Sequence, residues 1–120
     1  MTPREMLEAA GALLREPPPS MAHCWQRGCA TLMRAALEKQ LKAYWSSAAP
    51  SVARSAQRHQ LLALPSYAGS DVAATARSTW YGLSRAVHHH TYELPPTTAE
   101  LEAWHQDVVA LMPRLEPSAT

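Results

Sequence analysis

The stretch Gly28-Cys-Ala-Thr-Leu-Met-Arg-Ala-Ala-Leu-Glu-Lys-Gln-Leu-Lys-Ala-Tyr-Trp45 belongs to the longest helix that the sequence predicts, which runs from about Met21 to Trp45. Strong helix formers dominate it, and its apolar residues recur at intervals of three and four, the period of an α-helix. This apolar stripe consists of Trp25, Cys29, Leu32, Ala36, Leu37, Leu41 and Tyr44. At about 1.5 Å per residue the helix is roughly 37 Å long, enough to span a small helical bundle. The rest of the chain is therefore expected to pack around it.

Further helices are predicted on both sides by the same period and by the positions of prolines. A first helix starts at Pro3, which a first helical turn tolerates, and ends at the run Glu16–Pro19. After the long helix, Val52–Leu64 is predicted to form a third helix that Pro65 stops. Residues 66–70 then form a loop.

Two more helices complete the predicted fold. The fourth begins at Ser70 or Asp71, since either side chain can act as an N-cap. Its expected core stripe is Val72, Ala76, Trp80, Leu83 and Val87. The fifth opens with the capping box of Thr97 and Glu100, and Pro113 is expected to end it.

The length of 120 residues is sufficient for one domain with a substantial core. The sequence contains no segment with the period of a strand, no internal repeat and no Gly-rich phosphate loop. We predict an all-α, single-domain bundle of four to five helices over residues 1–112. A disordered tail is expected over residues 113–120.

Charge and apolar runs limit the partners and the compartment. The formal net charge is +1, which argues against a polybasic coat for DNA or membranes. No apolar run approaches about 18 residues, and the N-terminus does not resemble a secretory signal. We therefore expect a soluble, cytoplasmic protein without a membrane partner. Cys24 and Cys29 lie on different faces of the predicted helix, and both are expected to be reduced thiols.

The segment Ser84-Arg-Ala-Val-His-His-His-Thr-Tyr-Glu-Leu-Pro-Pro96 concentrates groups that handle protons and phosphate near neutral pH. Guanidinium groups suit phosphate oxygens, and imidazoles titrate near physiological pH. The candidate site residues are Arg85, His88, His89, His90, Tyr92 and Glu93. Because Pro95 and Pro96 force the fourth helix to end at or before Leu94, these side chains are expected at an accessible helix end.

The spacing of three of these residues is selective. Arg85 is followed five residues later by His90, and Tyr92 comes two residues after that. Arg54 and His59 repeat the first interval, but no tyrosine follows them at the second. The combined spacing therefore singles out the end of the fourth helix.

Structural roles remain alternatives for the same residue types. Arg85 can pair with Glu93 or cap the last carbonyl groups of the helix. Three consecutive histidines are typical of an exposed polar turn, because adjacent helical positions point about 100° apart and cannot all bind one metal ion. We predict neither a metal nor a cofactor. His23 and His105 are interpreted as partly buried, both cysteines as packing residues, and the four tryptophans as core or interface residues, with base stacking as their second alternative.

The pattern Arg85-Ala-Val-His-His-His90-Thr-Tyr92 resembles the signature of HEPN-domain ribonucleases, particularly HEPN toxins paired with minimal nucleotidyltransferase antitoxins. The resemblance includes the small bundle of four or five helices and its long Ala- and Leu-rich helix, and it covers roughly residues 20–112. One departure is Ala86, because many family members have a polar residue directly after the arginine. A second is the histidine triplet, which offers three imidazoles where the signature has one.

The resemblance implies metal-independent RNA cleavage at a site shared by two subunits of a homodimer. His90 would then act as the general acid or base and Arg85 would bind phosphate, with His89 and Glu93 as auxiliary residues. The resemblance also implies that a nucleotidyltransferase antitoxin adenylylates Tyr92. The alternative is a non-catalytic HEPN-like module that binds a partner protein or a nucleotide.

Overall fold

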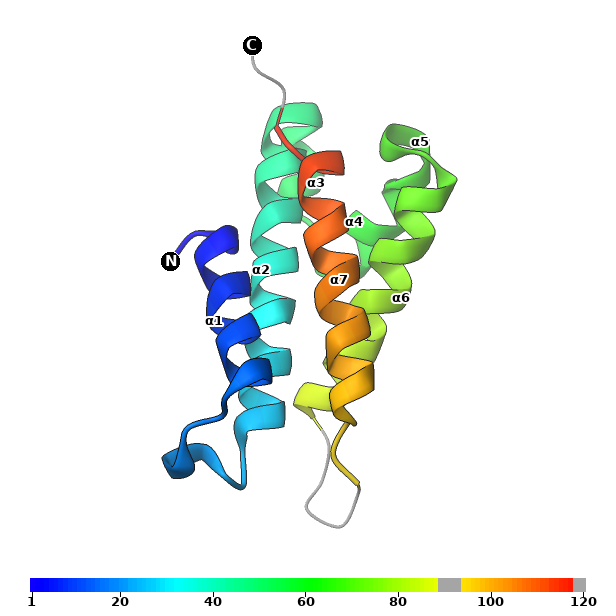
Figure 1. Ribbon diagram of the computed structural model, residues 1–120. Coiled ribbons are helices and arrows are strands. Elements are labelled where there is room, and N and C mark those ends of the chain that lie inside the picture. The colour runs from blue at the N-terminus through cyan, green and yellow to red at the C-terminus, as the bar shows by residue number, and fades with distance from the viewer. Residues whose placement is uncertain (89–93, 118–120) are drawn as a thin grey trace.

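Residues 1–88 and 94–117 are described by the computed structural model, and every regular element within them is helical. The elements are α1 (Pro3–Arg15), η1 (Pro19–Met21), α2 (Trp25–Ala48), α3 (Pro50–Ala53), α4 (Gln57–Ala63), α5 (Pro65–Ala68), α6 (Ser70–Val87) and α7 (Thr98–Arg114). The long helices α1, α2, α6 and α7 form the bundle and alternate in direction along the chain (Figure 1). The predicted all-α bundle is confirmed.

Helix α2 lies at the centre because it packs against α1, α6 and α7 alike. Its buried residues are Cys29, Ala30, Met33, Ala36, Leu37, Leu41 and Trp45. The predicted stripe faces the core, since its partly buried members Trp25, Leu32 and Tyr44 pack against it, and the fully buried Trp45 extends it. Trp45 is held by edge-to-face contacts with Tyr44 and Tyr67, at ring-centroid distances of 5.3 and 4.7 Å. The helix also starts four residues later than predicted, because η1 and a turn precede it.

The predicted third helix is instead two short helices, α3 and α4, separated by residues 54–56. The buried side chain of Gln60 explains the break, because its amide donates to the carbonyls of Ala53 and Ser55 at 3.3 and 3.1 Å. These two carbonyl groups have no partner within a helix at the break, and the Gln60 amide supplies the hydrogen bonds that they would otherwise lack. The preceding helix ends before Pro65, as predicted. The loop expected over residues 66–70 is wrong for its first residues, because Pro65 begins α5, and proline is well suited to a first helical position.

Helix α6 starts at Ser70, and its N-cap is Gly69 rather than the predicted Ser70 or Asp71. Gly69 has a φ of 96°, a conformation that residues with a Cβ rarely adopt. Helix α7 begins as predicted: Thr97 accepts from the backbone of Glu100, whose carboxylate accepts from the backbone of Thr97. The predicted capping box at the start of α7 is therefore confirmed. The predicted N-cap of α6 is wrong by one or two residues.

Pro113 does not end the last helix, which continues to Arg114. Leu115, expected in a disordered tail, is fully buried, and its carbonyl accepts from the side chain of Gln40 at 2.7 Å. The expected tail over residues 113–120 is thus wrong for its first residues. Residues 118–120 lie outside the described part of the chain.

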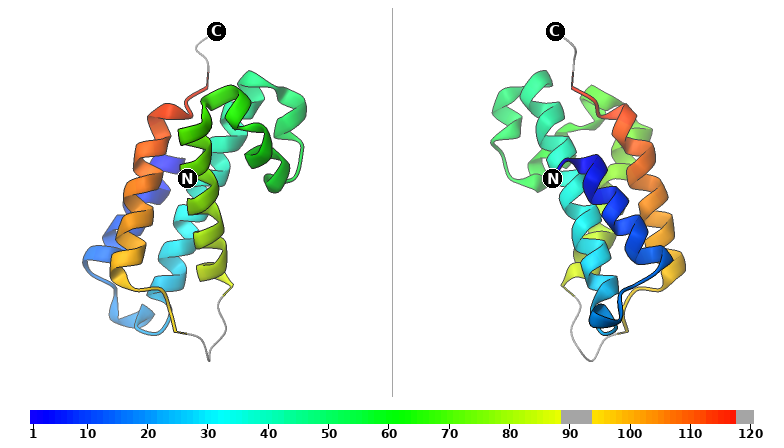
Figure 2. Two further views of the ribbon diagram at one scale, coloured as in Figure 1. Left: turned by 90° about the vertical axis from the view of Figure 1, so that its right-hand side faces the viewer. Right: turned by 60° about the vertical axis from the view of Figure 1, so that its left-hand side comes forward.

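The short helices α3 and α4 stand out from one end of the bundle, on the side away from α1 (Figure 2). The opposite end holds the C-terminal end of α6 and the first turn of α7 (Figure 1). Within residues 1–88 and 94–117, no helix combines the length and the apolar character needed to cross a membrane.

Candidate functional site

The predicted site lies at the C-terminal end of α6. Arg85 is exposed in the last turn of this helix, and His88 is the C-cap, whose backbone N–H donates to the carbonyl of Ser84 at 3.2 Å. The positive guanidinium is favourably placed there, because the carbonyl end of a helix carries partial negative charge. The other predicted residues, His89, His90, Tyr92 and Glu93, lie outside the described residues.

A pocket of about 380 Å³ opens beside Arg85, between α6 and the start of α7. Residues from both helices line it, because the segment 94–97 leads into the first turn of α7, which lies beside the end of α6. Its described lining combines one guanidinium, one carboxylate, an indole and apolar side chains. The candidate phosphate-binding residue therefore lies at the edge of an open pocket.

The wall of this pocket depends on a close approach between α6 and α7. A Cβ atom on Gly82 would lie 2.8–2.9 Å from three atoms of the Trp104 indole, distances that side chains do not tolerate. Glycine at this position lets the indole reach the backbone of α6. Trp104 is partly buried, packs against the core and also lines the pocket.

His88 is connected to the central helix through Arg34, a residue that the sequence analysis did not associate with the site. Arg34 Nη1 lies 3.2 Å from His88 Nε2. Because arginine only donates hydrogen bonds, this ring nitrogen is the acceptor of the contact. The contact fixes the end of α6 against α2.

Arg34 is itself held by two further groups. Its Nε lies 3.4 Å from Glu38 Oε2, an ion pair without hydrogen-bond geometry, and its Cζ lies 5.3 Å from the centre of the Trp80 ring. The Trp80 indole N–H donates to the same Glu38 oxygen at 3.0 Å. The i, i+4 spacing of Arg34 and Glu38 was a detectable signal, whereas the contact with His88 joins residues 54 positions apart and has no local signature.

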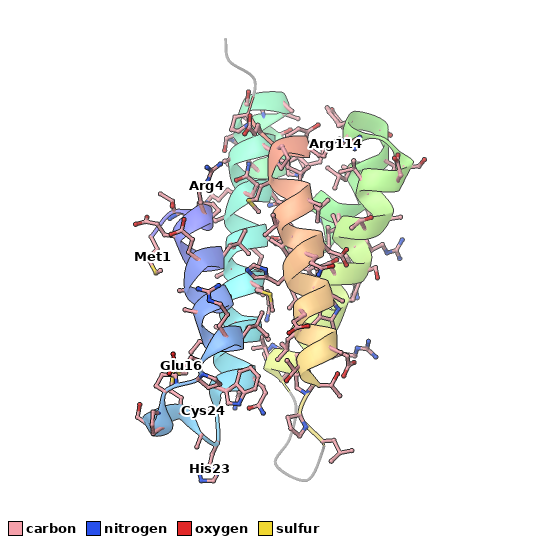
Figure 3. The ribbon with its side chains drawn as sticks, viewed as in Figure 1. Met1, Arg4, Glu16, His23, Cys24 and Arg114 are labelled. Carbon is pink, nitrogen blue, oxygen red and sulfur yellow. The ribbon has the colours of Figure 1, made fainter. Side chains whose placement is uncertain are left out.

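His23 and His105 were predicted to be partly buried and both cysteines to be packing residues, and the structure bears this out for one residue of each pair. His23 and Cys24 are exposed, so the interpretation was wrong for both (Figure 3). His105 is partly buried, as predicted, and its Nε2 donates to the carbonyl of Leu7 at 2.9 Å. Cys29 is fully buried, and this burial raises the pKa of its thiol to about 11. Both thiols are free, as expected.

Within the described residues, no group of three or more His, Cys, Asp or Glu side chains is arranged to hold a metal ion. The groups available at the end of α6 are a guanidinium, an imidazole and a pocket with an aromatic wall. Such groups bind anions and flat rings, and an imidazole exchanges protons near neutral pH. The chain matches no family model, and no curated protein or solved structure matches it.

Proposed function

We propose that the protein is a HEPN-like, metal-independent endoribonuclease whose site lies at the C-terminal end of α6. The observation that carries this proposal is Arg85, which is exposed beside a pocket and begins the Arg-x4-His-x-Tyr pattern. Among the residues that the structure describes, none forms an ion pair with Arg85. Its side chain is exposed, and the proposal assigns the guanidinium to a phosphate group.

In the proposed reaction an RNA 2′-oxygen attacks the adjacent phosphorus and the bond to the 5′-oxygen breaks. His90 takes the proton from the 2′-hydroxyl or gives one to the leaving oxygen. Arg85 stabilises the charge that develops on the phosphate oxygens. The products are a 2′,3′-cyclic phosphate and a 5′-hydroxyl. The proposal includes a homodimer that brings the Arg and His of both subunits together.

Regulation by a nucleotidyltransferase antitoxin is part of the same proposal. The enzyme would transfer AMP from ATP to the hydroxyl of Tyr92 and release pyrophosphate. The added phosphate would carry a negative charge close in sequence to Arg85, where it would compete with RNA for the guanidinium. His89 and Glu93 are proposed as auxiliary residues of the site.

A non-catalytic module that binds a partner protein or a nucleotide is the second candidate. Two observations favour it: Ala86, which follows Arg85, is a buried side chain rather than a polar one, and several residues lining the pocket are apolar. A partner side chain could occupy that pocket without any reaction.

Cleavage in the absence of metal distinguishes the two candidates. Purified protein is incubated with single-stranded RNA in EDTA, and the product ends are identified by mass spectrometry. We expect cleavage with 2′,3′-cyclic phosphate ends that His90→Ala lowers by about 100-fold or more, as expected for loss of a general acid or base. His59→Ala, which removes an exposed histidine from α4, is the matched control. Cleavage that needs added metal, or that His90→Ala leaves intact, would contradict the proposal.

A further inference from the structure

The pocket beside Arg85 has features that the cleavage reaction itself does not require. Its described lining includes Gly82, Pro95, Pro96, Glu100 and Trp104 in addition to the arginine. Its volume of about 380 Å³ lies near the lower end of the range of roughly 300–1,000 Å³ that is usual for ligand pockets. A single flat ring system suits this volume better than a large ligand.

The lining offers an aromatic surface next to a cation. The Trp104 indole reaches the pocket because Gly82 leaves room for it, and the two proline rings add rigid apolar surface. Nucleobases stack on such surfaces whatever their sequence, since every base has a π face. Arg85 lines the same pocket. A phosphate attached to the nucleotide whose base occupies the pocket would therefore lie near the guanidinium.

Glu100 adds a hydrogen-bond acceptor of fixed position. Its Oε1 accepts from the backbone N–H of Thr97 at 2.9 Å, while the Thr97 hydroxyl accepts from the backbone of Glu100 at 3.1 Å. The capping box therefore restrains the carboxylate, whose oxygens have further lone pairs. These can accept from the N–H groups on the edge of a base.

We infer that this pocket binds one unpaired nucleobase of the RNA whose phosphate Arg85 contacts. The base packs against Trp104 and the prolines, and its N–H edge donates to Glu100. The inference rests on the proposed function, from which the assignment of Arg85 to an RNA phosphate comes. A base can enter the pocket only when it is unstacked, so the substrate is single-stranded RNA or a loop.

Binding of an RNA that cannot be cleaved tests the pocket separately from the reaction. The probe is a fluorescent 2′-O-methyl oligonucleotide, which lacks the attacking hydroxyl, and its counterpart is the abasic chain of the same length. Affinities are measured by anisotropy at one salt concentration, because the phosphate contribution depends on salt. We expect the oligonucleotide with bases to bind about 10-fold more tightly than the abasic chain. Equal affinities overturn the inference.

A pair of variants tests the role of Glu100. Glu100→Gln preserves the capping box, which accepts either residue, but replaces an acceptor-only group with an amide. Glu5→Gln is the matched control, because Glu5 forms the same box with Thr2 at the start of α1. We expect Glu100→Gln to change the order of affinities for the four 2′-O-methyl homopolymers and Glu5→Gln to leave that order unchanged. An unchanged order in both variants, with unchanged melting temperatures, overturns the role of Glu100.

The results separate this inference from the proposed function. Cleavage in EDTA without any preference for bases over the abasic chain supports the function and overturns the base pocket. Base-dependent binding without cleavage supports the pocket and contradicts the ribonuclease proposal.

Discussion

Arg34 and Arg85 both lie at the end of α6 but differ in their surroundings, and we interpret their roles from this difference. Arg34 is surrounded by Glu38, Trp80 and His88, so its charge is paired with a carboxylate and its Nη1 is bonded to an imidazole within the protein. Arg85 is exposed at the edge of the pocket. We therefore interpret Arg34 as the residue that fixes the end of α6 and Arg85 as the residue that meets the ligand.

The buried thiol of Cys29 makes a testable contribution to stability. It donates to the carbonyl of Ala10 at 3.5 Å, and burial raises its pKa from 9.0 to about 11. The folded protein thus holds this proton more tightly than the unfolded chain. The resulting stabilisation is complete below about pH 9 and is lost as the pH rises through about 11.

We predict that the stability advantage of the wild type over Cys29→Ala narrows at alkaline pH. Urea unfolding of both proteins at about pH 8 and about pH 10.5 measures it. Burial also raises the pKa of Tyr44, but this residue is present in both proteins and its effect cancels in the difference. Cys24→Ala, which removes an exposed thiol, is the control and should differ from the wild type equally at both pH values. A constant difference for Cys29→Ala would refute the prediction.

At the scale of elements, periodicity and capping residues in the sequence predicted where the long helices lie, but not where a helix is broken or continues past a proline. Thr97 with Glu100 marked the start of α7, because a capping box is a contact between residues three positions apart. The break between α3 and α4 depends on Gln60, whose bonds to backbone carbonyls form only in the folded chain. Pro65 ends α4 as predicted but also begins α5, where a loop was expected, and Pro113 lies inside the last turn of α7 rather than ending it.

The end of α7 shows how tertiary contacts override a helix breaker. Proline at position 113 removes one backbone donor, which would otherwise bond to the carbonyl of Val109 on the exposed side of the helix. Leu115 is fully buried, its N–H donates to Leu111 and Met112, and its carbonyl is bonded by Gln40. These contacts hold the last turn in place beyond the proline. No periodicity in the sequence after residue 113 indicated them.

The contact between α6 and α7 predicts opposite behaviour for two glycines. Gly82→Ala should lower the free energy of unfolding by about 1–3 kcal/mol, because the new Cβ would overlap the Trp104 indole. Gly11→Ala should leave it unchanged or raise it by up to about 1 kcal/mol, since alanine favours helix and its nearest neighbour, at 3.3 Å, is the flexible end of Arg15. Urea unfolding of the two variants gives the comparison. Equal stabilities would show that the close approach at Gly82 is not a constraint.

At the scale of the whole molecule, the antiparallel bundle assembles the candidate site from three helices. The end of α6 supplies Arg85 and His88, the start of α7 supplies the pocket wall, and α2 supplies Arg34. Residue spacing in the sequence singled out Arg85, together with His90 and Tyr92, which lie outside the described residues. The contributions of α7 and α2 depend on how helices pack, and contacts such as that between Arg34 and His88 join positions that no local pattern connects.

The central claim is that Arg85 binds the RNA phosphate at the end of α6, and a matched pair of arginine variants tests it most directly. Arg77 is exposed two turns earlier on the same helix, so Arg77→Gln removes the same charge at a distance from the pocket. The measurement is the single-turnover rate of RNA cleavage in EDTA, with light scattering on the same samples to verify the dimer. We predict that Arg85→Gln slows cleavage by about 100-fold or more while Arg77→Gln stays within about twofold of the wild type. Equal rates for the two variants would contradict the claim.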